Sequence, residues 1–166
     1  MSSSPRVEES IDIAVAPRVA FAAVSDPRNY SRWSPEARGA RLPHDPPLTV
    51  GERFTGHNSL WARWSSECTV VTNDPDYNFS FEVRIAGILL SRWTYVIDDL
   101  TGSGAESLPR CRVTEQWDDL RRGPLTPVLR RLGLFVGRGT DAARRNAETM
   151  RYTLERLRFD LEGASQ

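Results

Sequence analysis

The 166-residue sequence contains no lysine and only two histidines and two cysteines, and its formal net charge is zero. Binding to phosphate backbones needs a clustered positive surface, and no long run of one charge appears, so we expect no nucleic-acid binding. All 22 basic residues are therefore arginine. We interpret this as a coding bias, and the weaker alternative is selection for bidentate anion binding.

Metal, cofactor and membrane signals are also missing. His44 and His57 are too few for a multi-histidine metal site, and Cys68 and Cys111 lack metal-type spacing. Glycine-rich phosphate loops, HExxH and GxSxG motifs do not occur, so we expect no cofactor. No apolar stretch approaches the length of a bilayer span, and residues 1–10 lack the apolar segment of a signal peptide. We expect a cytoplasmic protein without membrane insertion, whose cysteines are free.

What the sequence does contain is the composition of one soluble domain. It is 39% hydrophobic and 27% charged, and its length suffices for a substantial core. No internal repeat or second domain is visible. We expect residues 1–6 to be disordered and residues 7–162 to form a single domain.

The pattern of apolar residues predicts the order of the elements. Pro17 suits the first turn of a helix, and a second short helix follows over 27–33 until Ser34-Pro35 stops it. Residues 36–50, with "LPHDPPL", predict an irregular loop. Alternating apolar residues predict strands over 7–15, 51–61, 62–73, 79–85, 88–100 and 110–120.

The last part of the chain changes to a helical period. An apolar stripe predicts a long amphipathic helix and consists of Ala143, Ala147, Met150, Leu154, Leu157 and Leu161. Residues 124–140 predict a shorter apolar helix with glycine breaks. Short connections imply antiparallel strands, and one apolar sheet face beside one striped helix implies that the helix packs across the sheet. The fold class is therefore α+β.

Several blocks resemble a known family: "IDIAVAPRVAFAAVSDPRNYSRWSPE" (11–36), "GERFTGHN" (51–58), "RWSSECTVV" (63–71), "RWTYVID" (92–98) and "RVTEQWD" (112–118). Together with the terminal helix they resemble the START-like, helix-grip (SRPBCC) superfamily, in its polyketide cyclase/dehydrase-like branch. The resemblance implies a curved antiparallel sheet of six to seven strands around a long C-terminal helix, with two short helices after the first strand. It also implies a deep cavity for a small hydrophobic molecule, aromatic, polyketide-like or lipid-like.

Candidate cavity residues follow from strand parity and from the helix stripe. Each aromatic residue is by default part of the core, but together they exceed what a thin sheet-on-helix layer needs. Small residues at the start of the helix would leave room for a ligand. The ligand-binding candidates are Trp33, Phe54, Asn58, Trp64, Phe81, Trp93, Trp117, Phe135, Ala143, Ala147 and Met150.

The histidines have ordinary explanations. His44, in a proline-rich loop, is either solvated or at the mouth of a cavity, and we favour the solvated position. Asn58 shares a strand face with Phe54, which leaves His57 outside unless a bulge at Gly56 exchanges them. Asn58 either ties down the hairpin, which we favour, or orients a ligand carbonyl.

Glu115 is the anomaly of the last strand, because it lies between Val113 and Trp117 on an apolar face. A buried carboxylate must find a donor or have a raised pKa. Its structural partner would be Tyr95, Asn58 or an arginine at the rim. Its functional role would be general acid or base, or acceptor for a ligand hydroxyl, with Tyr95 as a second catalytic candidate.

These candidates leave three function classes. The first is a carrier or sensor that binds a hydrophobic ligand without chemistry. The second is a polyketide cyclase/dehydratase-like lyase that moves protons without metal or nucleotide. The third and weakest is an interaction module. The oligomeric state stays open, since the wet sheet face offers no large apolar patch.

Overall fold

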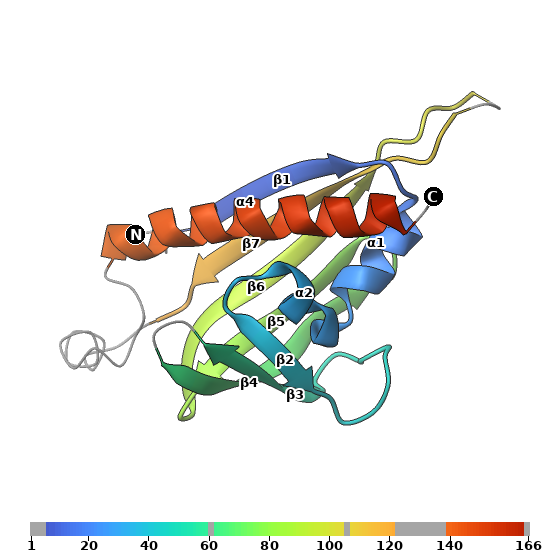
Figure 1. Ribbon diagram of the computed structural model, residues 1–166. Helices are drawn as coiled ribbons and strands as arrows, with labels where there is room; N and C mark the ends of the chain where they lie inside the picture. The colour runs from blue at the N-terminus through green and yellow to red at the C-terminus, as the bar shows by residue number, and fades with distance from the viewer. Residues whose placement is uncertain (1–5, 60–61, 105–106, 122–138, 165–166) are drawn as a thin grey trace, which may run out of the picture.

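One antiparallel sheet organises the molecule (Figure 1). The computed structural model describes residues 6–59, 62–104, 107–121 and 139–164. Seven strands of this part form the sheet: β1 (Arg6–Ile13), β2 (Ala37–Arg41), β3 (Arg53–Ser59), β4 (Arg63–Asp74), β5 (Asn78–Ile85), β6 (Ile88–Asp99) and β7 (Cys111–Asp119).

The strands follow the order β1-β7-β6-β5-β4-β3-β2, and every neighbouring pair is antiparallel. The sheet curls, and the long helix α4 (Gly139–Gly163) runs along its β1 side (Figure 1). Right-handed strand twist, together with register shifts in the β2–β3, β4–β5 and β5–β6 pairs, produces this curvature. The predicted α+β helix-grip fold is confirmed.

The short helices after β1 also match the prediction. Helix α1 (Pro17–Val24) has its proline in the first turn, where a missing N–H costs no hydrogen bond. The 3₁₀ helix η1 (Pro27–Asn29) is capped by Asp26, whose side chain accepts from the backbone N–H of Arg28. Helix α2 (Tyr30–Trp33) follows directly and stops before Pro35. This segment therefore runs back over the concave face of the sheet.

Two predictions about segment boundaries are wrong. Strand β2 lies inside residues 36–50, which were predicted to be an irregular loop. Its sequence, "ARGAR", has no apolar alternation, and it forms because it pairs with β3 at the edge of the sheet. Arg6 belongs to β1, where its guanidinium binds Asp118, and is not part of a disordered end. Residues 1–5 and most of the predicted 124–140 helix lie outside the described residues.

Helix α4 is fixed to the body through its C-terminal half. Met150, Leu154 and Leu157 are buried in the core, as the apolar stripe predicted. The Asp160 carboxylate accepts from the indole Nε1 of Trp33 at 3.0 Å and also pairs with Arg32 of α2. Further contacts join Arg151 to Glu9 at 2.8 Å and the backbone N–H of Ala14 to Glu162 at 2.9 Å. The N-terminal half of α4 is left to border the space inside the curled sheet.

Candidate ligand-binding cavity

A cavity of about 460 Å³ lies between the concave face of the sheet, the segment from η1 to β2, and helix α4. Its volume falls in the range typical of small-molecule sites. Seven aromatic side chains line it: Tyr30, Phe54, Trp64, Phe81, Trp93, Tyr95 and Trp117. Six of these follow from strand parity, because inward-facing residues alternate along each strand.

The register of the central strands brings these side chains together. Trp93 of β6 stands opposite Trp117 of β7, and Tyr95 stands opposite Glu115. On the other side of β6, Phe81 is paired with Trp93. Directly opposed residues share a face, so these side chains form one continuous wall. The predicted neighbourhood of Trp93, Tyr95 and Trp117 is confirmed.

Glu115 is buried in this wall, with 3% of its surface exposed. The Tyr95 hydroxyl donates to its Oε1 at 2.9 Å, so Tyr95 is the partner that the sequence left undecided. Its Oε2 is buried and has no hydrogen-bond partner within the described part of the chain. Burial raises the pKa of the Glu115 carboxyl to about 8, and the Tyr95 hydrogen bond opposes the shift. Glu115 is therefore mainly a neutral acid at pH 7.

Tyr30 covers the same region from α2, and sequence reasoning missed it. Its ring centroid is 5.7 Å from that of Tyr95 and 5.9 Å from that of Phe81. Its hydroxyl donates to the carbonyl of Val24 at 2.7 Å, which fixes the ring. Burial, and next the charge of Glu115, raise the pKa values of Tyr30 and Tyr95, so both phenols stay protonated. The only sequence signal for Tyr30 was its place in a short helix beside the sheet.

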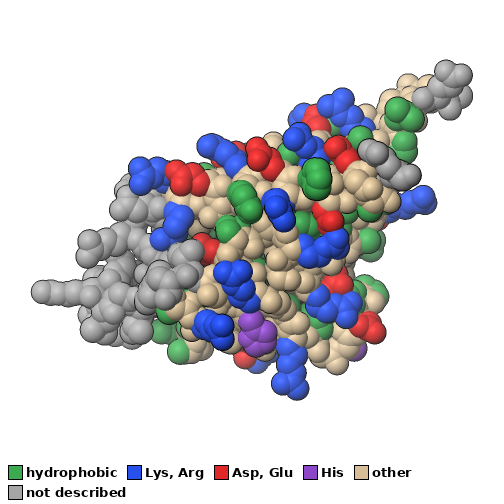
Figure 2. Space-filling view, in the orientation of Figure 1, with side chains coloured by type: hydrophobic (Ala, Val, Ile, Leu, Met, Phe, Trp, Pro, Cys, Tyr) green, Lys and Arg blue, Asp and Glu red, His purple; other side chains and the backbone are tan. Residues whose placement is uncertain are grey.

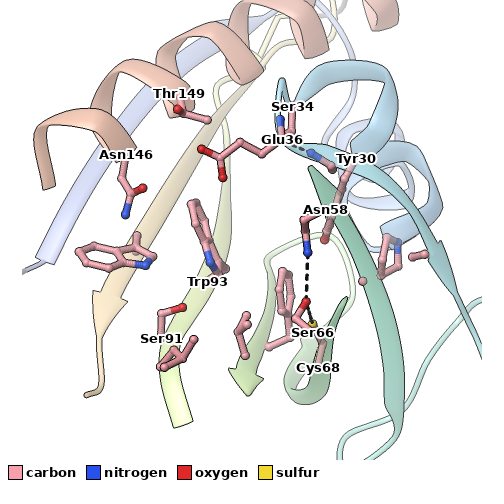
Figure 3. A pocket seen from close by; sticks show the side chains of 18 of the residues that line it. Tyr30, Ser34, Glu36, Asn58, Ser66, Cys68, Ser91, Trp93, Asn146 and Thr149 are labelled. Atoms are coloured by element: carbon pink, nitrogen blue, oxygen red, sulfur yellow. Dashed lines mark hydrogen bonds between the residues drawn. The ribbon is translucent and has the colours of Figure 1, made fainter. Parts of the chain in front are cut away.

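A polar chain crosses the β3–β4 wall (Figure 3). Asn58 donates through Nδ2 to the Ser66 hydroxyl at 3.3 Å, and this hydroxyl lies 3.7 Å from the Cys68 sulfur. Gly56 leaves room for Ser66, because a Cβ there would lie 2.9 Å from its hydroxyl oxygen. Asn58 thus both holds the hairpin and faces the cavity, as parity predicted, while His57 is exposed.

A second polar group, here called the polar rim, consists of Glu36, Arg145, Asn146 and Thr149. All four are half-buried cavity residues. Figure 3 shows Glu36 extending from the segment after α2 into the space between α4 and Trp93. Burial raises the pKa of Glu36, and the Arg145 guanidinium partly opposes the shift. Sequence periodicity did not identify these residues, because Glu36 falls in a predicted loop and the other three fall on the solvated face of the predicted helix.

The helix therefore presents a different face to the cavity than the stripe predicted. Arg145, Asn146, Thr149 and Thr153 line it, whereas the candidates Ala143 and Ala147 are not among the lining residues. Met150 is completely buried and packs in the core. Helix α4 packs mainly against β1, so the polar face beside its apolar stripe is the face that borders the cavity.

Two other candidates also lie elsewhere. Trp33 is 2% exposed and does not line the cavity, because its indole serves the junction between α2 and α4. Phe135 lies outside the described residues. The remaining candidates, Phe54, Asn58, Trp64, Phe81, Trp93 and Trp117, all line the cavity together with Glu115 and Tyr95.

The rest of the described chain offers few groups for other chemistry. His44 is exposed and contacts Glu52 and the Asp45 carbonyl, away from the cavity. Cys68 and Cys111 are buried free thiols. No cluster of three potential metal ligands occurs among the residues described, and no helix among them is long and apolar enough to cross a membrane. On the face in Figure 2, basic and acidic side chains are interspersed.

The model of the family described as polyketide cyclase / dehydrase and lipid transport matches residues 4–162. This chain belongs to that family. The match covers the whole sheet, both short helices and nearly all of α4. None of the curated proteins matches the sequence.

Solved structures share the fold of this family member at low sequence identity. A START superfamily protein from Mycobacterium smegmatis matches with a TM-score of 0.69 and 12% identity over 96% of this chain and 98% of its own. The Polyketide_cyc-like protein Cgl2372 from Corynebacterium glutamicum matches with a TM-score of 0.56 and 23% identity over 100% of this chain and 96% of its own. At such identities the likeness establishes the fold and leaves the ligand to be argued from the cavity.

Proposed function

We propose that this protein binds a small, largely apolar ring compound in its cavity and holds a carbonyl or hydroxyl oxygen of that compound with Glu115. The proposal rests on Glu115, which lines the cavity and whose buried Oε2 has no hydrogen-bond partner among the described residues. An unsatisfied buried polar atom is costly, and a ligand oxygen would remove that cost.

The protonation state decides which ligand atom fits. With its pKa at about 8, Glu115 carries a proton at neutral pH. Its Oε1 accepts from Tyr95, so we place the acidic proton on Oε2, which then donates to an acceptor on the ligand. The aromatic wall supplies apolar contact for rings, and Trp93 and Trp117 flank the acid on both strands. A ring-bearing ketone satisfies both requirements.

The test uses 2-acetylnaphthalene, a ketone that does not titrate, with 2-isopropylnaphthalene as its oxygen-free control. We expect ketone affinity, measured by calorimetry, to be constant below about pH 7 and to fall about tenfold per pH unit well above pH 8, because only protonated Glu115 donates. In Glu115→Gln the amide N–H₂ donates at every pH, so affinity should stay flat. The affinity of the control ligand should not depend on pH in either protein. Failure of both compounds to bind, or a flat profile in the wild type, would overturn the proposal.

A second candidate function is proton transfer on the bound ketone, favoured by a pKa near neutrality on a buried carboxyl that lines the cavity. In dehydration of a β-hydroxy ketone, the Glu115 carboxylate removes the α-proton and an enolate forms. The resulting acid then protonates the β-hydroxyl, the C–O bond breaks, the C=C bond forms, and water leaves. Each cycle returns the carboxylate. The family description, cyclase/dehydrase, is consistent with this step.

This candidate predicts a pH profile opposite to that of binding. The rate of enone formation from 4-hydroxy-4-(2-naphthyl)butan-2-one, followed by absorbance, should rise with pH and level off above about pH 8, as the carboxylate accumulates. Glu115→Gln should bind the compound but react at the uncatalysed rate. Binding without any rate above that of buffer identifies the protein as a carrier and rejects the enzymatic role.

A further inference from the structure

The polar rim has no role in holding the Glu115-bound oxygen, yet it faces the same cavity. Glu36 approaches from the segment after α2, and Asn146 and Thr149 approach from α4, so that all three lie around one space beside Trp93 (Figure 3). These side chains offer a carboxylate, an amide and a hydroxyl, and Arg145 adds a guanidinium. Both donors and acceptors are therefore present at this end.

The charges of the rim cancel among the described residues. Glu36 and Arg145 carry opposite signs, and the guanidinium acts electrostatically on the carboxyl. Among the described residues, the other cationic side chain that lines the cavity is Arg121, which is held in a largely buried ion pair by Asp119. A ligand anion would meet Glu36, and a ligand cation would meet Arg145. A neutral group that donates and accepts hydrogen bonds meets no like charge.

The rim and Glu115 act at separate places. Glu115 stands opposite Tyr95 in the pairing of β6 with β7, whereas the rim lies beside Trp93, two residues away along β6. The two groups therefore contact different parts of a bound molecule.

We infer that the polar rim selects ligands whose apolar ring body carries a neutral hydroxyl or amide group at the end away from the oxygen held by Glu115. This inference rests on the proposed function and specifies its ligand class. The ligand is then polar at both ends and apolar in the middle, with a neutral substituent placed between Glu36 and the polar face of α4.

The experiment compares four probes that differ only at position 6 of 2-acetylnaphthalene: hydrogen, hydroxymethyl, carboxylate and aminomethyl. Calorimetry at pH 7 measures each dissociation constant. We expect the hydroxymethyl compound to bind about five- to tenfold more tightly than the parent, the effect of one added hydrogen bond. The carboxylate and ammonium compounds should bind more weakly than the hydroxymethyl compound.

Variants of the rim assign the effect to residues. Asn146→Leu and Thr149→Val should each reduce the hydroxymethyl advantage while leaving the affinity of the parent ketone within about twofold. Glu36→Gln removes the negative charge, so the carboxylate probe should gain affinity several-fold and the ammonium probe should lose it. Glu155→Gln, the same charge change on an exposed position of α4 outside the cavity, is the matched control and should alter none of these values.

The outcomes separate this inference from the proposed function. If the probes bind but their affinities do not depend on the substituent, or Glu36→Gln and Glu155→Gln behave alike, the rim selects nothing and the inference is overturned while the proposed function stands. If tight binding follows the carboxylate or the ammonium probe, the ligand class is wrong. If no probe binds the wild type, the proposed function and the inference fall together.

Discussion

Raising the pH from about 5.5 to 8 is expected to destabilise the wild-type protein, and Glu115→Gln is expected to remove most of that loss. The folded-state pKa of Glu115 is raised from 4.5 to about 8. Below pH 4.5 both folded and unfolded chains bind the proton. Between the two values only the folded state holds it, so stability falls as pH rises. At about 1.4 kcal/mol per unit, the loss over this window is on the order of 3 kcal/mol.

Glu115→Gln keeps the acceptor for Tyr95 and has no charge to bury. Its stability should therefore change little over the same window and exceed that of the wild type at pH 9, although it is no more stable at pH 5.5. Urea unfolding at several pH values measures both curves. The difference between the two proteins cancels other titrating groups, such as His44, whose pKa is raised by the Asp45 carbonyl and Glu52.

Parallel curves for wild type and Glu115→Gln would show that Glu115 ionises normally in the folded state. In that case the side chain would be hydrated or paired with a cation, and the description of a neutral buried acid would be wrong. Tyr95→Phe provides a second check. It removes the donor that lowers the pKa of Glu115, so the pH-dependent loss should extend to higher pH than in the wild type.

Met150→Ala is expected to destabilise the protein by about 2–5 kcal/mol and to leave ketone affinity nearly unchanged. Met150 has no exposed surface and packs in the core beneath α4. Truncation there creates a cavity that the surrounding core closes only in part. The measurement is urea unfolding at pH 6, where Glu115 is protonated, together with calorimetry of 2-acetylnaphthalene.

Trp93→Ala is the matched contrast, because this half-buried side chain already borders the open cavity. We expect a smaller loss of stability than in Met150→Ala, together with roughly tenfold weaker ketone binding from the lost apolar contact. The reverse result would be that Met150→Ala abolishes binding and Trp93→Ala lowers only stability. In that case the ligand would lie against the apolar face of α4, as the stripe predicted.

Strand alternation was sufficient to predict the aromatic wall. Each inward position of β5, β6 and β7 is defined by parity, and short connections fix the antiparallel pairing that sets Trp93 beside Trp117 and Tyr95 beside Glu115. The burial of Glu115 followed from the same alternation. Strand parity and short connections are local properties of the chain, so a single sequence is enough to predict them.

The remaining features depend on contacts between distant segments. Strand β2 has no alternation of its own and exists because β3 offers an edge. The polar rim combines a loop residue with three residues of α4, and only the path of the chain over the sheet brings them together. The apolar stripe predicted which face of α4 is buried, but it could not distinguish burial against protein from burial against a cavity.

A carbon-13 NMR titration of the Glu115 side-chain carboxyl tests whether this residue is a neutral buried acid that donates to a ligand oxygen. Glu115→Gln assigns the resonance. We expect a midpoint near pH 8 in the free protein and a higher midpoint when 2-acetylnaphthalene is bound, because the ligand prefers the protonated form. A midpoint near the ordinary value of 4.5, unmoved by the ketone, would contradict it.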